Sequence, residues 1–286
     1  MEKKKNMTPL EETFYRFCRN KISLFGLLIV IAIILVIIFG EFISPYEYGV
    51  KQDIPHRLQG PSSEHWFGTD GYGRDIFSRV IHGTKYTMVI AVPATLCAQL
   101  IGAMLGACAA FYSRWVDDIL MRILDVFQAI PGTLLALAIV AALGTSLPNL
   151  VIAMMISRIP GATRSARAVM LSLVGQDHID AARSYGSRDW QLIFRHIIPN
   201  ALGPVIVDFT INLSAITLQV SSLSYIGLGV QPPTPEWGVL LSEAREFMQV
   251  APHTILFPGL AILFAALAFN LVGDGLRDAL DPRLRD

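Results

Sequence analysis

Long apolar stretches alternate with short polar segments along most of this 286-residue chain. A helix that crosses a membrane needs about 20 mostly apolar residues, and six stretches approach that length. The pattern therefore predicts an all-α integral membrane protein with six spanning helices. The third stretch carries Arg122 and Asp125 near its start, and the fourth is interrupted by Arg158, Pro160 and Gly161. The predicted spans cover residues 22–40, 86–112, 122–143, 147–169, 199–222 and 252–273.

A charged, amphipathic segment, DHIDAARSYGSRDWQLIFRHIIPN, lies between the fourth and fifth predicted spans. Gly186 predicts the end of a first helix, and Ser187 predicts the cap of a second one that opens with Asp189 and runs to residues 198–199. The segment is either a docking element for a partner or an interfacial helix resting on lipid headgroups. Its apolar residues recur at helical spacing: Ile179, Ala182, Gly186, Trp190, Ile193 and Ile197.

Charge supports the membrane assignment and predicts an orientation. Charged residues make up 16% of the chain, against about 25% in soluble domains. Basic residues collect on the cytoplasmic side of membrane proteins, and with the N-terminus inside, the inside segments hold 17 of the 23 Lys and Arg residues. We therefore expect both termini and the amphipathic segment in the cytoplasm. Lys3, Lys4 and Lys5 precede the first apolar run, but that run is longer than a signal-peptide core of about 7–15 residues, so we expect a retained span.

Two spans carry patterns of their own. Gly102, Gly106 and Ala110 recur every fourth residue in the second span, which favours close helix packing either within the chain or at a dimer seam. Asp208, Asn212 and Gln219 share one face of the fifth span. Polar groups inside a membrane mark functional sites by default, so this face either lines an aqueous route for a polar substrate or forms hydrogen bonds between helices.

Motifs for catalysis are absent from the sequence. No Gly-x-x-x-x-Gly-Lys-Ser/Thr loop occurs, so no phosphate-binding loop for ATP is predicted. The six histidines are scattered, the serines show no nucleophile-elbow pattern, and the three cysteines, Cys18, Cys97 and Cys108, suggest neither a disulfide framework nor a zinc site. We therefore expect neither an enzyme nor a metal or other cofactor site in this chain.

The amphipathic segment also carries a family resemblance. Asp180-Ala-Ala, followed by Gly186 and by Ile198-Pro199, resembles the EAA loop of ABC importer permeases, with Asp where the family has Glu. Four further stretches resemble, in the same order, the permeases of the dipeptide, oligopeptide, glutathione and nickel class. They are PLEETFYRFCRNKISLFG, HWFGTDGYGRDIFSRVIHG, SYIGLGVQPPTPEWGVLLSEAR and FNLVGDGLRDALDPRL.

The resemblance implies a type I ABC importer transmembrane fold and the shorter-loop member of a permease pair in a bacterial inner membrane. The implied partners are a second homologous permease, two ATPase subunits that bind ATP and Mg, and an external solute-binding protein, with no nucleic acid. The proline-rich loop 231–238 would brace the permease pair, meet the binding protein or be an ordinary turn. The implied ATPase-coupling residues are Asp180, Ala181, Ala182, Arg183, Tyr185 and Gly186.

The expected organisation has three parts. Residues 1–85 form an N-terminal peptide-permease segment, residues 86–276 form the permease core with a coupling loop at 175–197, and residues 277–286 form a cytoplasmic tail. A dipeptide, oligopeptide or glutathione is the expected substrate. The alternatives are an importer of nickel or another small polar solute, a stand-alone secondary transporter, which would show repeated halves, and an integral membrane enzyme.

Overall fold

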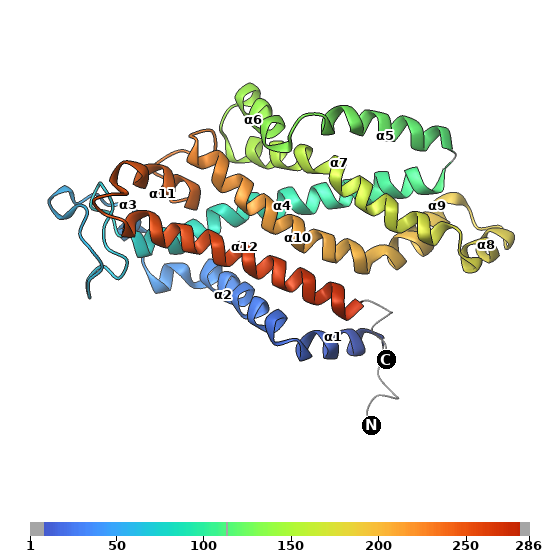
Figure 1. Cartoon of the computed structure of the whole chain (residues 1–286), viewed down its shortest axis with the longest axis horizontal. Helices are drawn as coiled ribbons and strands as arrows, with labels where there is room; N and C mark the ends of the chain where they lie inside the picture. The colour runs from blue at the N-terminus through green and yellow to red at the C-terminus, as the bar shows by residue number, and fades with distance from the viewer. Residues whose placement is uncertain (1–8, 113, 281–286) are drawn as a thin grey trace.

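The computed structural model describes residues 9–112 and 114–280, which form an elongated bundle of helices without a strand in those residues (Figure 1). Lys3–Lys5 and residues 281–286 of the expected tail lie outside the described residues. The helices are α1 (Pro9–Arg19), α2 (Lys21–Ile43), α3 (Tyr46–Val50), α4 (Ile76–Phe111), α5 (Arg114–Gln128), α6 (Gly132–Leu143), α7 (Leu147–Val174), α8 (Asp177–Ser184), α9 (Asp189–Gln191), α10 (Ile198–Tyr225), α11 (Trp237–Ala244) and α12 (His253–Leu280).

Short polar side chains begin several of these helices. The Asn20 side chain accepts hydrogen bonds from the backbone N–H groups of Ile22 and Ser23, where α2 begins. The Asp75 side chain accepts one from Ser78 at the start of α4. Such caps satisfy backbone donors that have no partner inside the helix.

Small residues bring α4 and α7 into close contact. A Cβ atom added to Gly102 would lie 2.6 Å from the Cβ of Ala162, and one added to Gly106 would lie 2.8 Å from the backbone nitrogen of Arg167. Neither distance leaves room for a side chain, so the two glycines are required where the helices cross. The prediction of close packing within the chain is confirmed for this stripe.

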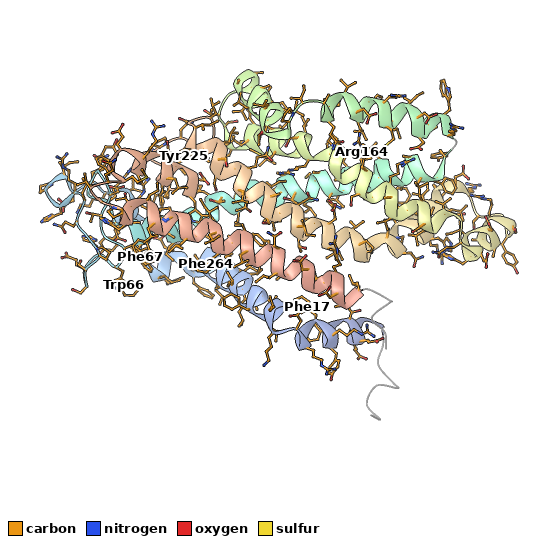
Figure 2. The ribbon with its side chains drawn as sticks, in the orientation of Figure 1. Phe17, Trp66, Phe67, Arg164, Tyr225 and Phe264 are labelled. Carbon is orange, nitrogen blue, oxygen red and sulfur yellow. The ribbon has the colours of Figure 1, made fainter. Side chains whose placement is uncertain are left out.

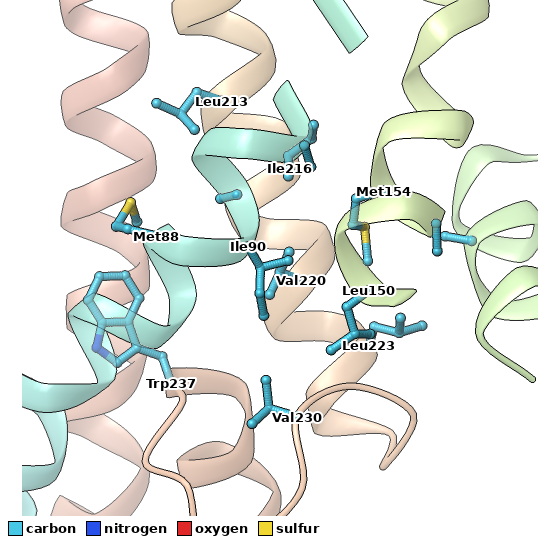
Figure 3. Packing of buried hydrophobic residues seen from close by; sticks show 14 of the residues in the cluster. Met88, Ile90, Leu150, Met154, Leu213, Ile216, Val220, Leu223, Val230 and Trp237 are labelled. Carbon is cyan, nitrogen blue, oxygen red and sulfur yellow. The ribbon is translucent and has the colours of Figure 1, made fainter. Parts of the chain in front are cut away.

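The main core lies where α4, α7 and α10 meet near α11 (Figure 3). Ile90, Met154 and Ile216, one from each of the three long helices, are fully buried. Trp237 at the start of α11 packs against the same cluster, and its indole N–H donates a hydrogen bond to the carbonyl of Val80, 3.0 Å away. The proline-rich loop thus ends on a helix that is anchored in the core of its own chain.

Four helical stretches are long and apolar enough to cross a membrane: residues 21–43, 76–111, 189–225 and 253–280. They contain the predicted first, second, fifth and sixth spans, except for residue 112 at the end of the second and residue 252 at the start of the sixth. Helix α4 extends ten residues before the predicted start at 86, because Asp75 caps it there.

The third and fourth predicted spans differ from expectation. Residues 122–143 are not one helix: α5 ends at Gln128, α6 begins at Gly132, and the two are bent by 79°. Pro131 lies in this break, and proline disfavours helical backbone in the residue before it. Helix α7 is continuous through Pro160 and is not interrupted there. With three arginines, α7 is not among the apolar spans, so the described residues hold four candidate spans, or five if the bent pair counts as one.

Charged side chains tie α11 to the loop that precedes α4. The carboxylates of Asp70 and Glu243 both accept hydrogen bonds from Arg74 and from Arg79, at 2.6–2.8 Å. Both arginines are almost fully buried, and a buried charge is tolerated only with such partners. Trp66 and Phe67 lie at the same end of the molecule (Figure 2).

Glu236 is a second buried acid at this end. It is fully buried, and its carboxylate accepts hydrogen bonds from the Thr87 hydroxyl and from the backbone N–H groups of Gly238 and Val239. It therefore caps α11 and ties it to α4 at once. Burial raises the pKa of the Glu236 carboxyl, because the charged form loses its hydration.

Helices α8 and α9 lie at one end of the long axis, and α3 and α11 lie at the other (Figure 1). Helix α1 and the last turns of α12 lie toward the α8 end, and they contact each other where Phe17 faces Gly275. The arrangement is compatible with both termini on the side of the amphipathic segment. The assignment of that side to the cytoplasm stays a prediction.

Candidate functional sites

The predicted helix end at Gly186 is confirmed by its backbone. Gly186 has φ +84°, a left-handed conformation that favours glycine. Its N–H donates to the carbonyl of Arg183 at 3.0 Å, and the N–H of Ser187 donates to the carbonyl of Ala182 at 3.1 Å. These two bonds form a Schellman motif, so α8 ends in a well-defined turn.

The second helix begins at Asp189, as predicted, but its cap is one residue later than predicted. The capping position is Arg188 and not Ser187, whose backbone N–H donates to Ala182 in the turn. The side-chain oxygen of Gln191 accepts a hydrogen bond from the Arg188 N–H at 2.9 Å. From Asp189 the chain is helical to Tyr225, through a wider π-helical turn at Leu192–Ile197. The second half of the amphipathic segment, from Asp189 onward, and the fifth span are therefore one continuous helical piece.

The turn divides the predicted apolar stripe into two parts. Ile179, Ile193 and Ile197 are buried in a cluster with Ala107 of α4 and Met170 of α7. Trp190 is 57% exposed and does not join them, although it lies in the same helical piece as Ile193 and Ile197. The buried half anchors the segment to its own bundle.

The side of α8 away from the bundle is open. Asp180, Ala181 and Arg183 are exposed, Ala182 is half-buried, and Tyr185 is 92% exposed. The Arg183 guanidinium lies 3.7 Å from Asp180 and over the ring of Phe111, 5.5 Å from its centroid. A Cβ atom on Gly186 would meet nothing within 4 Å. Within the described residues, all six candidate coupling residues thus form one short exposed segment.

The three polar residues of α10 form two separate groups. The Asp208 carboxylate accepts hydrogen bonds from the side-chain amides of Asn212 and of Gln99 on α4, each at 3.1 Å. Gln219 lies farther along and accepts a hydrogen bond from Arg158 of α7 at 3.0 Å. Its own amide donates to the carbonyl of Gly132 at 3.2 Å. The hydrogen bonds between helices that the sequence suggested are present at both points.

Both groups also line cavities. Asp208 lies in an open cavity of about 600 Å³ between α7, α10 and α12, which Arg277 also lines. Asn212 and Gln219 line a second cavity of about 310 Å³ beside the break between α5 and α6. The polar face of α10 therefore has access to space on one side while it is hydrogen-bonded on the other.

The family model of the binding-protein-dependent transport system inner membrane component matches residues 100–286. The chain belongs to this family of inner-membrane transport permeases. A second family model, the N-terminal transmembrane domain of oligopeptide transport permease C, matches residues 8–61. The protein is therefore a multi-pass permease component of the bacterial inner membrane.

Curated relatives match along almost the whole chain. The dipeptide transport system permease protein DppC of Alkalihalophilus pseudofirmus is 43% identical over 98% of this chain and 91% of its own length. The glutathione transport system permease protein GsiD is 43% identical in Pectobacterium atrosepticum and 45% identical in Escherichia coli, over 97% of this chain and 92% of its own length. Together with the family models, these matches confirm the resemblance to peptide permeases.

A solved structure has the same fold. A chain of the MetNI methionine ABC transporter, in an inward-facing conformation, matches with a TM-score of 0.59 and 15% sequence identity. The match covers 71% of this chain and 97% of that one. The expected type I importer fold is confirmed.

Sequence reasoning missed three residues at these sites: Arg158, Gln99 and Arg277. A signal was present for Arg158, because a charge in a predicted span is by itself a functional indication. In the sequence, Arg158 is visible only as an irregularity of the fourth predicted span. Gln99 carries no such signal, because it is a neutral amide in a helix of 36 residues. Only its hydrogen bond to the Asp208 carboxylate on another helix makes it part of the site.

Proposed function

We propose that the chain is one of two permease subunits of an ABC importer that takes up a small peptide, such as a dipeptide, an oligopeptide or glutathione. The proposal rests on membership of the family and on relatives named for dipeptide and glutathione transport. ATP hydrolysis takes place in separate ATPase subunits that bind ATP and Mg, and an external binding protein delivers the substrate. Residues 180–186 of this chain contact an ATPase subunit.

The observation that carries the coupling role is the construction of α8. Its apolar side packs against the chain's own helices, since Ile179 is fully buried in the cluster with Ile193 and Ile197. Its other side is exposed and carries mostly polar or small side chains, such as Asp180, Ala181 and Arg183, with Tyr185 at its end. An interfacial helix needs a free apolar face to enter lipid. This distribution favours docking onto a protein over resting on headgroups.

The continuity of the segment with α10 supports a mechanical link. Displacement of α8 by an ATPase subunit moves the anchored Ile193 and Ile197, and with them the helical piece from Asp189 to Tyr225. That piece carries Asp208 and Gln219 beside the two cavities. When ATP closes the ATPase pair, the helices rock and the pathway opens outward; hydrolysis resets it.

Reconstitution tests this function. The chain is purified with its co-expressed second permease and ATPase subunits and placed in proteoliposomes with the binding protein. We expect uptake of a labelled dipeptide or of glutathione that requires ATP, and neither uptake nor ATPase activity from the chain alone. ATP-driven uptake by this polypeptide alone, or failure of an ATPase subunit to co-purify, contradicts the proposal.

A further inference from the structure

Arg158 faces the cavity beside the break between α5 and α6. The cavity has a volume of about 310 Å³, near the lower end of the roughly 300–1,000 Å³ of small-molecule sites. Arg158 is the one charged residue among the described residues that line it. Its other polar lining comes from side chains that include Asn212 and Gln219. The cavity therefore has a positive charge at one wall and neutral groups elsewhere.

The charge of Arg158 is not neutralised by any carboxylate in the described residues. Its guanidinium donates one hydrogen bond, to the side-chain oxygen of Gln219 at 3.0 Å, and its buried Nε has no partner there. The two other arginines of α7 differ: Arg164 pairs with Asp125 and Arg167 pairs with Asp117, both on α5. An arginine stays charged in proteins, and a half-buried charge without a counter-charge is costly.

Gln219 fixes the position of this charge. Its amide donates to the carbonyl of Gly132 at the start of α6 while its oxygen accepts from Arg158. The guanidinium is thus held against one wall of the cavity, and its remaining N–H donors are left for a ligand. Guanidinium donors match the two oxygens of a carboxylate, with which they form charge-assisted pairs.

We propose that Arg158 binds the carboxylate of the transported peptide on its way through the membrane, with Gln219 as the positioning residue. This inference rests on the proposed function and adds to it a contact for substrate inside the permease. The contact is a single residue in an open cavity. That suits a pathway in which a substrate must be held but also released.

Uptake by the reconstituted importer tests the proposal. Arg158→Gln is expected to lower uptake of a labelled dipeptide about tenfold, the effect of losing one hydrogen bond to a charged group, with assembly and binding-protein-stimulated ATP hydrolysis retained. Arg158→Lys keeps the charge but lacks the paired donors, so its uptake is expected to lie between that of Arg158→Gln and that of the parent. Arg164→Gln, the matched control on the same helix, is expected to transport normally.

A second measurement asks whether the ligand is a carboxylate. The assembled complex, without binding protein, is treated with a guanidinium-modifying dicarbonyl reagent, and modification of Arg158 is followed by mass spectrometry. A dipeptide is expected to slow it, and the same dipeptide with an amidated C-terminus is expected to do so much less. Arg164 serves as the internal control, unaffected by either peptide.

The outcomes separate this inference from the proposed function. Parent-level uptake by Arg158→Gln, equal loss with Arg158→Lys, or equal modification rates with the two peptides overturns the carboxylate contact while the importer still works. Loss of subunit assembly in Arg158→Gln also overturns it and assigns Arg158 to a subunit contact. No peptide uptake by a parent complex that hydrolyses ATP contradicts the proposed function instead.

Discussion

Replacement of Gly186 by leucine isolates the role of the α8 turn. In this chain the added Cβ has nothing within 4 Å, so the first atom of the new side chain meets open space. The cost within the chain is the left-handed backbone at φ +84°, roughly 1–2 kcal/mol for a residue with a Cβ. The permease should therefore still insert and fold, with a locally strained turn.

The expected loss lies in the contact with the ATPase subunit. A leucine side chain projects into the space that a docking surface must occupy, and we expect ATPase retention to fall at least about tenfold, which corresponds to roughly 1.4 kcal/mol. Gly186→Ala imposes the same backbone strain with one methyl group and should lose less. The difference between the two variants reports the partner contact, since the strain is common to both.

The assay is pull-down of the ATPase subunit at equal permease expression, beside uptake in cells. Gly227→Leu is a matched control, because Gly227 has φ +83°, ends α10 with the same pair of turn hydrogen bonds and also has nothing within 4 Å of an added Cβ. It follows the end of α10 that packs against α11, at the opposite end of the bundle from α8. Full ATPase retention and normal uptake in Gly186→Leu would refute the docking argument and favour a segment that rests on lipid.

Three further predictions concern the bundle. Gly106→Val should destabilise the protein by about 1–3 kcal/mol through overpacking against α7, measured by thermal unfolding in detergent, whereas Gly161→Ala, which meets nothing within 4 Å, should not. Burial raises the pKa of Glu236, so the contribution of this residue to stability is present below its unfolded-state pKa and is lost as the pH rises through its folded-state pKa. Glu236→Gln should therefore gain stability relative to the parent as the pH rises. A stability difference that is the same at all pH values contradicts this. Asp208→Leu removes the carboxylate that accepts hydrogen bonds from Gln99 and Asn212, and it should alter uptake with assembly largely kept. Asp208→Asn keeps an acceptor oxygen, so a parallel loss of uptake in that variant assigns the effect to the charge. Unchanged uptake in both variants limits Asp208 to packing.

Features governed by local backbone demands were predictable from the sequence. Gly186 ends α8 because a left-handed turn is easiest for glycine, and four spans follow from apolar length alone. The effect of a proline on its helix could not be predicted from the local sequence, as Pro131 and Pro160 show. Pro131 lies at a break and Pro160 lies inside a continuous helix, although each directly follows an isoleucine. The difference is tertiary: Pro160 is buried in the helix that packs along α4.

The candidate sites divide in the same way. The shared face of Asp208, Asn212 and Gln219 follows from helical spacing, but their separation into two groups depends on Gln99 and Arg158, which come from other helices. The ion pairs that hold α5 along α7 likewise join residues that are far apart in the sequence. Such partners follow from the fold and not from any local pattern.

The most direct test of the account is to identify what Tyr185 touches in the assembled importer. Tyr185 is 92% exposed, and replacing it with the photoreactive benzoylphenylalanine keeps an aromatic side chain at the tip of α8. Irradiation should give a covalent adduct with an ATPase subunit, and the same replacement of Trp66, exposed at the opposite end of the bundle (Figure 2), should give none. Lipid adducts alone from position 185, in a complex that transports peptide, would contradict the assignment of α8 as the contact through which ATP hydrolysis drives this permease.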